Sequence, residues 1–177
     1  MIKQENSIFW FRRDLRLSDN HGLYQSLTQS GTVLPIFIFD PNILETLADK
    51  ADKRVNFIYQ TLKAIQEQLT ETGSSLYVLH ATPLEAFEQL TKAYDIKAVY
   101  TNHDYEPYAI ARDTEVSEFL KTKHIAFHSF KDQVIFEKDD IVKDDGSPYT
   151  VFTPYSKKWK SKLDDYSARS FASEKLM

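Results

Sequence analysis

Residues 7–20 read SIFWFRRDLRLSDN, and this stretch decides the fold of the chain. It begins with an apolar run, Ile8 to Phe11, that predicts a buried strand. Arginines and aspartates alternate directly behind this run, and Ser18 or Asp19 is placed to cap a helix that follows. In open α/β sheets, ligands bind beyond the carboxyl ends of the strands. We therefore expect this first strand to end at a ligand-binding crevice.

Strand and helix patterns alternate along most of the chain. The predicted strands are 8–11, 33–39, 75–80, 97–101 and 125–130. After the short helix that ends at Gly31, the predicted helices are 55–69, 83–94, 107–121 and 151–163. Strands that alternate with helices of this length indicate βαβ units. The sequence therefore predicts an α/β fold, a doubly wound, Rossmann-like, five-stranded parallel sheet with helices on both faces.

The bulk composition excludes several classes of protein. The 177 residues include no cysteine, which rules out disulfides, thiolate zinc sites and a cysteine nucleophile. A net charge of -4 argues against a surface that lies mostly on nucleic acid. No apolar run approaches the roughly 20 residues of a membrane span, and the N-terminus has no signal-peptide pattern. We expect a soluble, cytoplasmic protein without a membrane partner.

The familiar nucleotide and metal motifs are absent. The chain has 4 glycines, too few for a dinucleotide fingerprint or a phosphate-binding loop. Its 5 histidines are scattered. His124 and His128 have helical spacing but fall on a predicted strand, so we expect no metal site.

Three polar segments follow predicted strands, at 12–14, 40–42 and 102–106. In a doubly wound sheet they meet at one edge, where guanidinium and carboxylate groups would surround a crevice. Such a crevice suits a flat polar ring better than a phosphate, which favours glycines and backbone amides. Four aromatic side chains are expected to wall it: Trp10, Phe37, Phe39 and Tyr105.

A structural alternative applies to the same charged residues, because ion-pair networks imitate sites. In that alternative the arginines Arg12, Arg13 and Arg16 pair with aspartates and pin strand to helix. The expected partners are Asp14, Asp19 and Asp113.

A second cluster, 149–163, mixes lysines with aromatic residues. Between Val151 and Leu163 it has four lysines and no acid. Such a mixture can bind nucleic acid. Since the chain as a whole is acidic, we favour a docking face formed by Phe152, Tyr155 and Trp159, with solvated lysines.

Residues 7 to about 163 resemble the N-terminal α/β domain of DNA photolyases and cryptochromes, most closely class I cyclobutane pyrimidine dimer photolyases. The resemblance is carried by FWFRRDLRLSDN, PIFIFDPNIL, KRVNFIYQTLKAIQEQL, AVYTNHDYEPYAIARD, KDQVIFEKDDI and PYTVFTPYSKKW. It implies a domain that holds an antenna chromophore and passes excitation energy to FAD in a separate helical C-terminal domain. In the full enzyme, reduced FAD splits pyrimidine dimers that are flipped out of damaged DNA.

The resemblance also implies a division of the chain. We expect a photolyase-type α/β domain over 1–135 and an extension over 136–163 that docks on the helical flavin domain in cis. The polar stretch 164–177 would be a linker or a cut end, and the chain an excised fragment without catalytic residues. An uncovered docking face favours self-association of such a fragment.

The resemblance implies which residues line the antenna pocket. They are Arg12, Phe39, Asp40, Arg54, Asp104, Glu106 and Ala109. Arg12 and Arg54 would offer charge-assisted donors, and Asp104 would accept a hydrogen bond from the ring edge.

The identity of the antenna also follows from the resemblance. Folate-binding members carry Asn-Glu where this chain has Tyr108 and Ala109, and a histidine where it has Leu47, so methenyl-tetrahydrofolate is disfavoured. Deazaflavin-binding members share the Asp104-x-Glu106-Pro-Tyr pattern, although they often have glycine in place of Ala109. We favour 8-hydroxy-deazaflavin or another flavin, or no antenna at all.

Two alternatives remain for function. One is the same domain of a cryptochrome, a blue-light receptor without repair activity. The other is a stand-alone flavin- or nucleotide-binding module without a light function.

Overall fold

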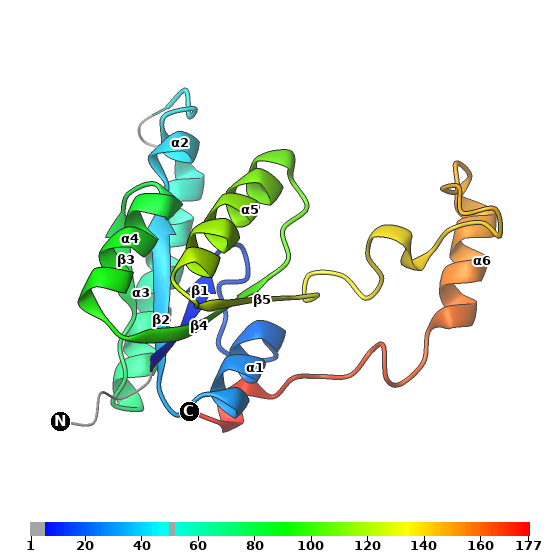
Figure 1. Cartoon of the computed structure of the whole chain (residues 1–177). Helices are drawn as coiled ribbons and strands as arrows, with labels where there is room; N and C mark the ends of the chain where they lie inside the picture. The colour runs from blue at the N-terminus through cyan, green and yellow to red at the C-terminus, as the bar shows by residue number, and fades with distance from the viewer. Residues whose placement is uncertain (1–5, 50–51) are drawn as a thin grey trace.

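The computed structural model describes residues 6–49 and 52–177 (Figure 1). Its sheet has five parallel strands in the order β3-β2-β1-β4-β5. The strands are β1 (Asn6–Phe11), β2 (Val33–Phe39), β3 (Tyr77–His80), β4 (Ile96–Asn102) and β5 (Ala126–Phe130). The predicted α/β fold is confirmed. The chain reverses direction across the sheet between β1 and β4, which is the topological switch point.

Six α-helices and two 3-10 helices lie within the described residues. They are α1 (His21–Gln29), α2 (Pro41–Leu44), α3 (Lys53–Glu71), α4 (Pro83–Ala93), α5 (Pro107–Thr122), α6 (Phe152–Lys162), η1 (Lys138–Asp140) and η2 (Ser173–Lys175). The sequence did not predict the four-residue α2. Asp40 starts it by accepting a hydrogen bond from the backbone N–H of Asn42 at 3.0 Å.

The first strand lies at the centre and is buried on both faces. Ile8 and Trp10 point to one face, where α4 and α5 contribute Phe87 and Leu120 to the same cluster. Phe9 and Phe11 point to the other face, against α1 and α3. The period-2 alternation of a strand therefore divides one apolar run between two cores.

The cap of α1 differs from the prediction. Asn20, not Ser18 or Asp19, is the N-cap residue, and its Oδ1 accepts from the backbone N–H of Leu23 at 3.1 Å. Asp19 instead has a left-handed backbone with φ of 49°. Its carboxylate accepts from the backbone N–H of Phe171 at 2.8 Å. Asp19 therefore binds the C-terminal segment at Phe171 instead of capping α1.

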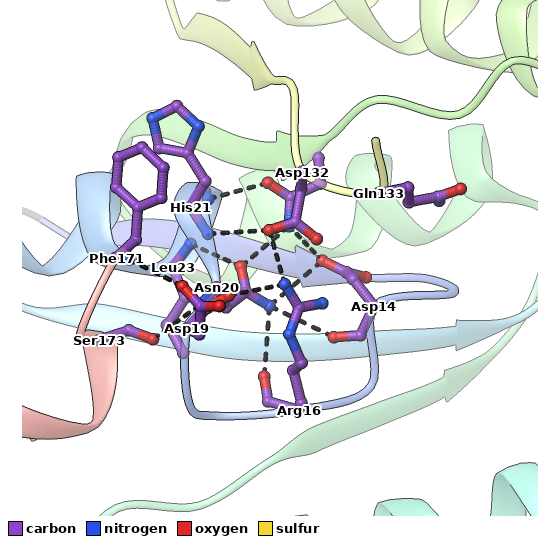
Figure 2. Close-up of polar contacts among 12 residues, drawn as sticks. Asp14, Arg16, Asp19, Asn20, His21, Leu23, Asp132, Gln133, Phe171 and Ser173 are labelled. Atoms are coloured by element: carbon purple, nitrogen blue, oxygen red, sulfur yellow. Dashed lines mark hydrogen bonds and ion pairs between the residues drawn. The ribbon is translucent and has the colours of Figure 1, made fainter. Parts of the chain in front are cut away.

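A buried polar network ties the carboxyl ends of β1 and β4 to the start of α1 (Figure 2). Asn102, at the end of β4, donates from Nδ2 to Asp14 at 2.6 Å and to Asn20 at 2.8 Å. Its Oδ1 accepts from the backbone N–H of Gly22 at 2.8 Å. Both hydrogen-bonding ends of one amide are therefore used at the switch point.

Beyond β5 the chain leaves the sheet and then returns to it. Figure 1 shows α6 standing apart from the body, and none of its residues is buried. The stretch 164–177, expected to be a linker or cut end, runs back to α1 with a defined course. The Phe171 ring stacks on His21 with centroids 3.6 Å apart. Ser173 is fully buried and donates to the Leu17 carbonyl at 2.6 Å.

The close approach of α1 to the sheet requires glycine at position 22. A Cβ there would lie 2.7 Å from Asn102 Oδ1 and 2.9 Å from a ring carbon of Phe9. We predict that Gly22→Ala lowers the free energy of unfolding by about 1–3 kcal/mol, the usual range for overpacking. Chemical denaturation measures the change.

Gly31→Ala is the matched control, because nothing lies within 4 Å of a Cβ built on Gly31. We expect it to leave stability unchanged or slightly raised. Equal losses for the two variants would contradict a specific steric role for Gly22.

Candidate functional site

A cavity of about 370 Å³ opens beyond the carboxyl ends of β1 and β2. Side chains from α2, α3 and the first turns of α5 complete its wall. All seven residues predicted to line an antenna pocket border this cavity: Arg12, Phe39, Asp40, Arg54, Asp104, Glu106 and Ala109. The fold therefore brings together residues that are separated by up to about a hundred positions in sequence. A cavity of this size falls in the range of small-molecule sites, roughly 300–1,000 Å³.

Three of the four predicted aromatic residues wall the cavity, namely Trp10, Phe37 and Phe39. The prediction for Tyr105 was wrong. Its hydroxyl donates to Glu137 at 2.6 Å, and its ring borders a separate groove beside α5 and β5. Burial, together with the hydrogen bond to Glu137, raises the pKa of Tyr105. Its neighbour Asp104 borders both that groove and the cavity.

Two buried arginines form the floor beside Trp10. Arg12 Nη1 lies 2.6 Å from both carboxylate oxygens of Asp113, and Arg112 Nη2 lies 2.9 Å from the nearer one. Arg12 also donates to the Asn102 carbonyl. The two guanidinium carbons lie 5.1 and 4.9 Å from the Trp10 ring centroid. Burial lowers the pKa of Arg12, and Asp113 opposes that shift.

The three arginines of the opening motif form ion pairs with three different residues. The alternative in which arginines pin strand to helix holds for Arg12, which pairs with Asp113 on α5. Arg13 pairs with Glu106 at 2.5 Å rather than with a residue of its own motif. Arg16 pairs with Asp132 at 2.8 Å instead of with the Asp14 or Asp19 carboxylate.

Asp104 stands out among the carboxylates of the cavity. Its side chain is 7 % exposed, yet its nearest cations, Arg13 and Arg112, lie 3.6 and 3.9 Å away. Among the described residues, the one hydrogen bond to its carboxylate comes from the Glu106 backbone N–H and is 3.5 Å long. A buried carboxylate with only long contacts has unused acceptor capacity, which is costly unless a donor is supplied. The chemistry of this wall therefore fits a ligand with an N–H edge.

The other two carboxylates predicted to line the pocket, Asp40 and Glu106, already have partners within the protein. Asp40 caps α2 and accepts a hydrogen bond from the Tyr108 hydroxyl. Glu106 precedes α5 and is held by Arg13. Arg54 lies at the mouth of the cavity, where its side chain is 75 % exposed and pairs with Asp52 at 2.6 Å. Arg54 is therefore the guanidinium most accessible to solvent in this wall.

Among the polar residues that line the cavity, sequence reasoning did not propose Arg112, and it used Tyr108 only to compare folate- and deazaflavin-binding members. Arg112 lies three residues after Ala109, so the two share a face of α5. That spacing was the available signal. Tyr108 lines the cavity and holds Asp40, a role that only the approach of α5 to β2 creates.

The chain belongs to the DNA photolyase family, since its residues 7–173 match the family model for DNA photolyase. It is 39% identical over 154 residues to a deoxyribodipyrimidine photo-lyase from a Synechococcus species, covering 87% of this chain and 32% of the relative. It is 31% identical over 166 residues to cryptochrome-2 of Arabidopsis thaliana, covering 93% of this chain and 26% of the relative. The chain thus spans about a third or less of these two relatives.

Solved structures agree with this assignment. A bacterial class III photolyase from Agrobacterium tumefaciens superposes with a TM-score of 0.80 at 25% identity, over 93% of this chain and 33% of that one. An archaeal photolyase from Sulfolobus tokodaii with two FAD molecules superposes with a TM-score of 0.76 at 28% identity, over 90% and 36% of the two chains. The resemblance to the photolyase and cryptochrome family is confirmed.

Two further searches concern the described residues only. Over 6–49 and 52–177, no group of three or more His, Cys, Asp or Glu side chains is arranged to hold a metal ion. Over the same ranges, no helix has the length and apolar character needed to cross a membrane.

The ion pair between Arg54 and Asp52 at the cavity mouth shifts the pKa of Asp52. The hydrogen bonds from the Arg54 side chain and backbone lower the pKa of Asp52 from 3.8 to about 2. A carboxylate with a depressed pKa stabilises the folded state above its unfolded pKa, and loses this effect as the pH falls through the folded value. We predict an Asp52 titration midpoint near 2. NMR titration of the carboxyl carbon measures it.

In the same experiment, Arg54→Gln should raise the Asp52 midpoint, because the side-chain donor is lost. Lys63→Gln, which removes an exposed charge further along α3, is the control and should not move it. An unchanged midpoint in Arg54→Gln would contradict the assignment.

Proposed function

We propose that this chain is the antenna-chromophore domain of a light-dependent DNA repair photolyase. In the parent protein, reduced FAD in a helical C-terminal region would split pyrimidine dimers in damaged DNA. This chain would supply no catalytic residue. Its task would be to hold a light-absorbing dye and pass excitation energy on.

The observation that carries the proposal is the convergence of all seven predicted residues on one cavity. Aromatic side chains wall it, and the nearly buried Asp104 offers acceptor capacity that protein groups leave unused. Ala109 is 3 % exposed in the first turns of α5, where a bulky side chain would fill the space. These features fit a flat ring system with N–H donors at its edge.

A deazaflavin or flavin fits this wall better than a folate. Tyr108 and Ala109 occupy the two positions where folate-binding members resemble one another in carrying Asn-Glu, and Tyr108 is already hydrogen-bonded to Asp40. The photolyase of Sulfolobus tokodaii, 28% identical to this chain, is described with two FAD molecules and a novel light-harvesting cofactor. We therefore propose 8-hydroxy-deazaflavin or another flavin as the ligand.

Each residue of the cavity would have a physical rather than a chemical task. Asp104 would accept from the ring edge and fix its orientation. Arg54, at the mouth, would offer donors to a polar tail. Arg12 would act mainly by holding α5 against β1 through Asp113. The aromatic wall would exclude water, and the bound dye would supply absorption and energy transfer.

A second candidate is the same domain of a cryptochrome. The 31% identity to Arabidopsis cryptochrome-2 over 166 residues supports this second candidate. The antenna role of the cavity would be unchanged, and only the reaction of the flavin-binding region would differ. Photorepair of a dimer-containing oligonucleotide by the full-length parent separates the two candidates.

The exposed face of α6 would dock on the helical flavin region in cis. Phe152 is 77 % exposed, and Trp159 contacts Phe136 with ring centroids 5.5 Å apart. The relatives are about three times as long as the matched segment, so they have further chain that could cover such a face. Repair of damaged DNA would then require both parts.

The chromophore site is tested by titrating the chain with 8-hydroxy-deazaflavin, FMN and methenyl-tetrahydrofolate. We predict uptake of the deazaflavin or FMN, read by absorbance and fluorescence, and no uptake of the folate. Asp104→Ala should weaken binding roughly 10- to 100-fold, since a hydrogen bond to a charged group contributes about 1.5–3 kcal/mol. Its circular dichroism spectrum should be unchanged.

The control is Asp165→Ala, which removes an exposed aspartate remote from the cavity lining. It should bind the dye like the unmodified chain. If Asp104→Ala binds equally well, Asp104 is structural; if no dye binds at all, the antenna proposal is wrong for this chain.

The docking face is tested by sedimentation velocity over a range of concentrations. We predict that the chain self-associates and that Phe152→Ser shifts it toward the monomer, because the variant removes the most exposed apolar ring of α6. Phe57→Ser, which removes a ring 70 % exposed on α3, is the matched control. A strictly monomeric profile, or equal effects of the two variants, would overturn the prediction.

A further inference from the structure

A groove of about 690 Å³ lies beside α5 and β5. β5 is the edge strand of the sheet next to β4, and its alternating residues Phe127 and Ser129 both line the groove. The loop after β4 and the segment after β5 contribute His103 and Lys138. Among the described lining residues, this groove shares Asp104 alone with the cavity beyond β1 and β2. The proposed antenna role makes no use of the rest of it.

Three side chains at this groove form a continuous row of hydrogen bonds. Ser129 Oγ lies 3.1 Å from His103 Nε2, and His103 Nδ1 lies 2.8 Å from Glu137 Oε2. Ser129 is exposed, whereas the side chains of His103 and Glu137 are 24 % and 16 % exposed. An accessible serine, a histidine within reach of it and a carboxylate behind the histidine are the parts of a nucleophilic triad. Such a triad is recognised by its geometry and not by its order along the chain.

The carboxylate of Glu137 determines which nitrogen of His103 carries the proton. Burial raises the pKa of Glu137, but hydrogen bonds from Tyr105 and His103 outweigh burial and lower this pKa. An ionised carboxylate can only accept, so His103 donates to it from Nδ1. In the neutral imidazole Nε2 is then an acceptor, and the Ser129 hydroxyl donates to it. This direction of the hydrogen bond is the one that a general base requires.

The backbone positions the histidine and the carboxylate. His103 directly follows β4, and its backbone N–H donates to the Phe130 carbonyl at 2.7 Å, next to Ser129 on β5. Glu137 directly precedes η1, where its backbone N–H donates to the Asp140 carboxylate at 2.9 Å. The base and the group that orients it are therefore held in place from two different segments.

The rest of the lining indicates the kind of substrate. Lys138 lines the groove, and its charge contributes to the low pKa of Glu137, so a cation lies near the triad. A cation in that position stabilises the oxyanion that forms in acyl transfer. Ile110, 54 % exposed, and Phe127 offer apolar contacts to an acyl chain. The exposed carboxylate of Glu118 also borders the groove and disfavours an acidic substrate.

We propose that Ser129 and His103, oriented by Glu137, hydrolyse small neutral carboxylic esters. Ser129 Oγ attacks the ester carbonyl carbon, and its proton passes to His103 Nε2. The bond from this carbon to the alcohol oxygen breaks, and His103 returns the proton to the leaving alcohol. Water then attacks the acyl-serine by the same route, which releases the acid and restores the Ser129 hydroxyl.

The test is incubation of the 177-residue chain with p-nitrophenyl acetate, with nitrophenolate release followed by absorbance. We expect release at least ten times faster than with Ser129→Ala. Mass spectrometry after a rapid acid quench should find the acetyl group on Ser129, and a fluorophosphonate should label the same residue with loss of fluoride. Equal release by the two chains would overturn the proposal, because exposed lysines also accept acetyl groups. Labelling confined to other residues would overturn it as well.

Two further variants separate the base from the general effects of substitution. His103→Gln should reduce release to the level of Ser129→Ala, because general-base catalysis contributes roughly 100-fold or more. Ser75→Ala is the control, since it removes an exposed hydroxyl ahead of β3, and it should react like the unmodified chain. Circular dichroism checks that each variant is folded. Full activity of His103→Gln, or an equal loss in the control, would contradict the assignment.

NMR of the ring nitrogens tests the orientation of His103 without any substitution. At an alkaline pH that keeps the imidazole neutral, we expect the proton of His103 on Nδ1. A proton on Nε2 would overturn the proposal, because that nitrogen could not accept from Ser129.

Uptake of the deazaflavin is measured on the same chains. Ser129→Ala should take up the dye like the unmodified chain, since Ser129 does not border the cavity beyond β1 and β2. A chain that cleaves the ester through Ser129 but binds no dye would refute the antenna role alone. The two proposals can therefore fail independently.

Discussion

The side-chain amide of Asn102 is the constraint on which the rest of this structure depends. It lies where the chain reverses its direction across the sheet, and it joins β4 to Asp14 and Asn20 with bonds of 2.6 and 2.8 Å. Because both ends of the amide are used, the loop after β1 and the start of α1 have fixed positions relative to β4. The Asn102 carbonyl also accepts a hydrogen bond from Arg12, so the same residue helps to fix the floor of the cavity beyond β1 and β2.

Much of the fold could be predicted because its signals are local and repetitive. The apolar run of β1, buried on both faces, and the helical stripe of α3 each depend on neighbours within a few residues. The cap of α1 could not be predicted in this way. Asp19 is as good a capping residue as Asn20, and only the returning backbone of Phe171 removes it from that role. The course of 164–177 was missed for the same reason, since a fully buried serine leaves no hydrophobic periodicity.

The candidate site also contains residues that could be predicted from the sequence and residues that could not. The family resemblance supplied seven residues that meet at one cavity, although their binding role remains a proposal. Tyr105 was misplaced because successive residues of an irregular loop have no fixed alternation, and Glu137, far along the chain, captures its hydroxyl. Arg112 was missed because a buried arginine contradicts the usual hydrophobic inner face of a helix; it is tolerated here only because Asp113 and the Trp10 ring surround it.

The positions of the two tryptophans give the chain an intrinsic pair of optical reporters. Trp10 is buried beside two guanidinium groups in the wall of the cavity beyond β1 and β2, whereas Trp159 lies on helix α6 against Phe136. Their surroundings differ in polarity and exposure, so their emission should differ in wavelength and in accessibility to quenchers. Light absorbed by Trp10 would be released within van der Waals reach of any dye in the cavity. A dye bound as proposed would therefore lie beside a built-in ultraviolet donor.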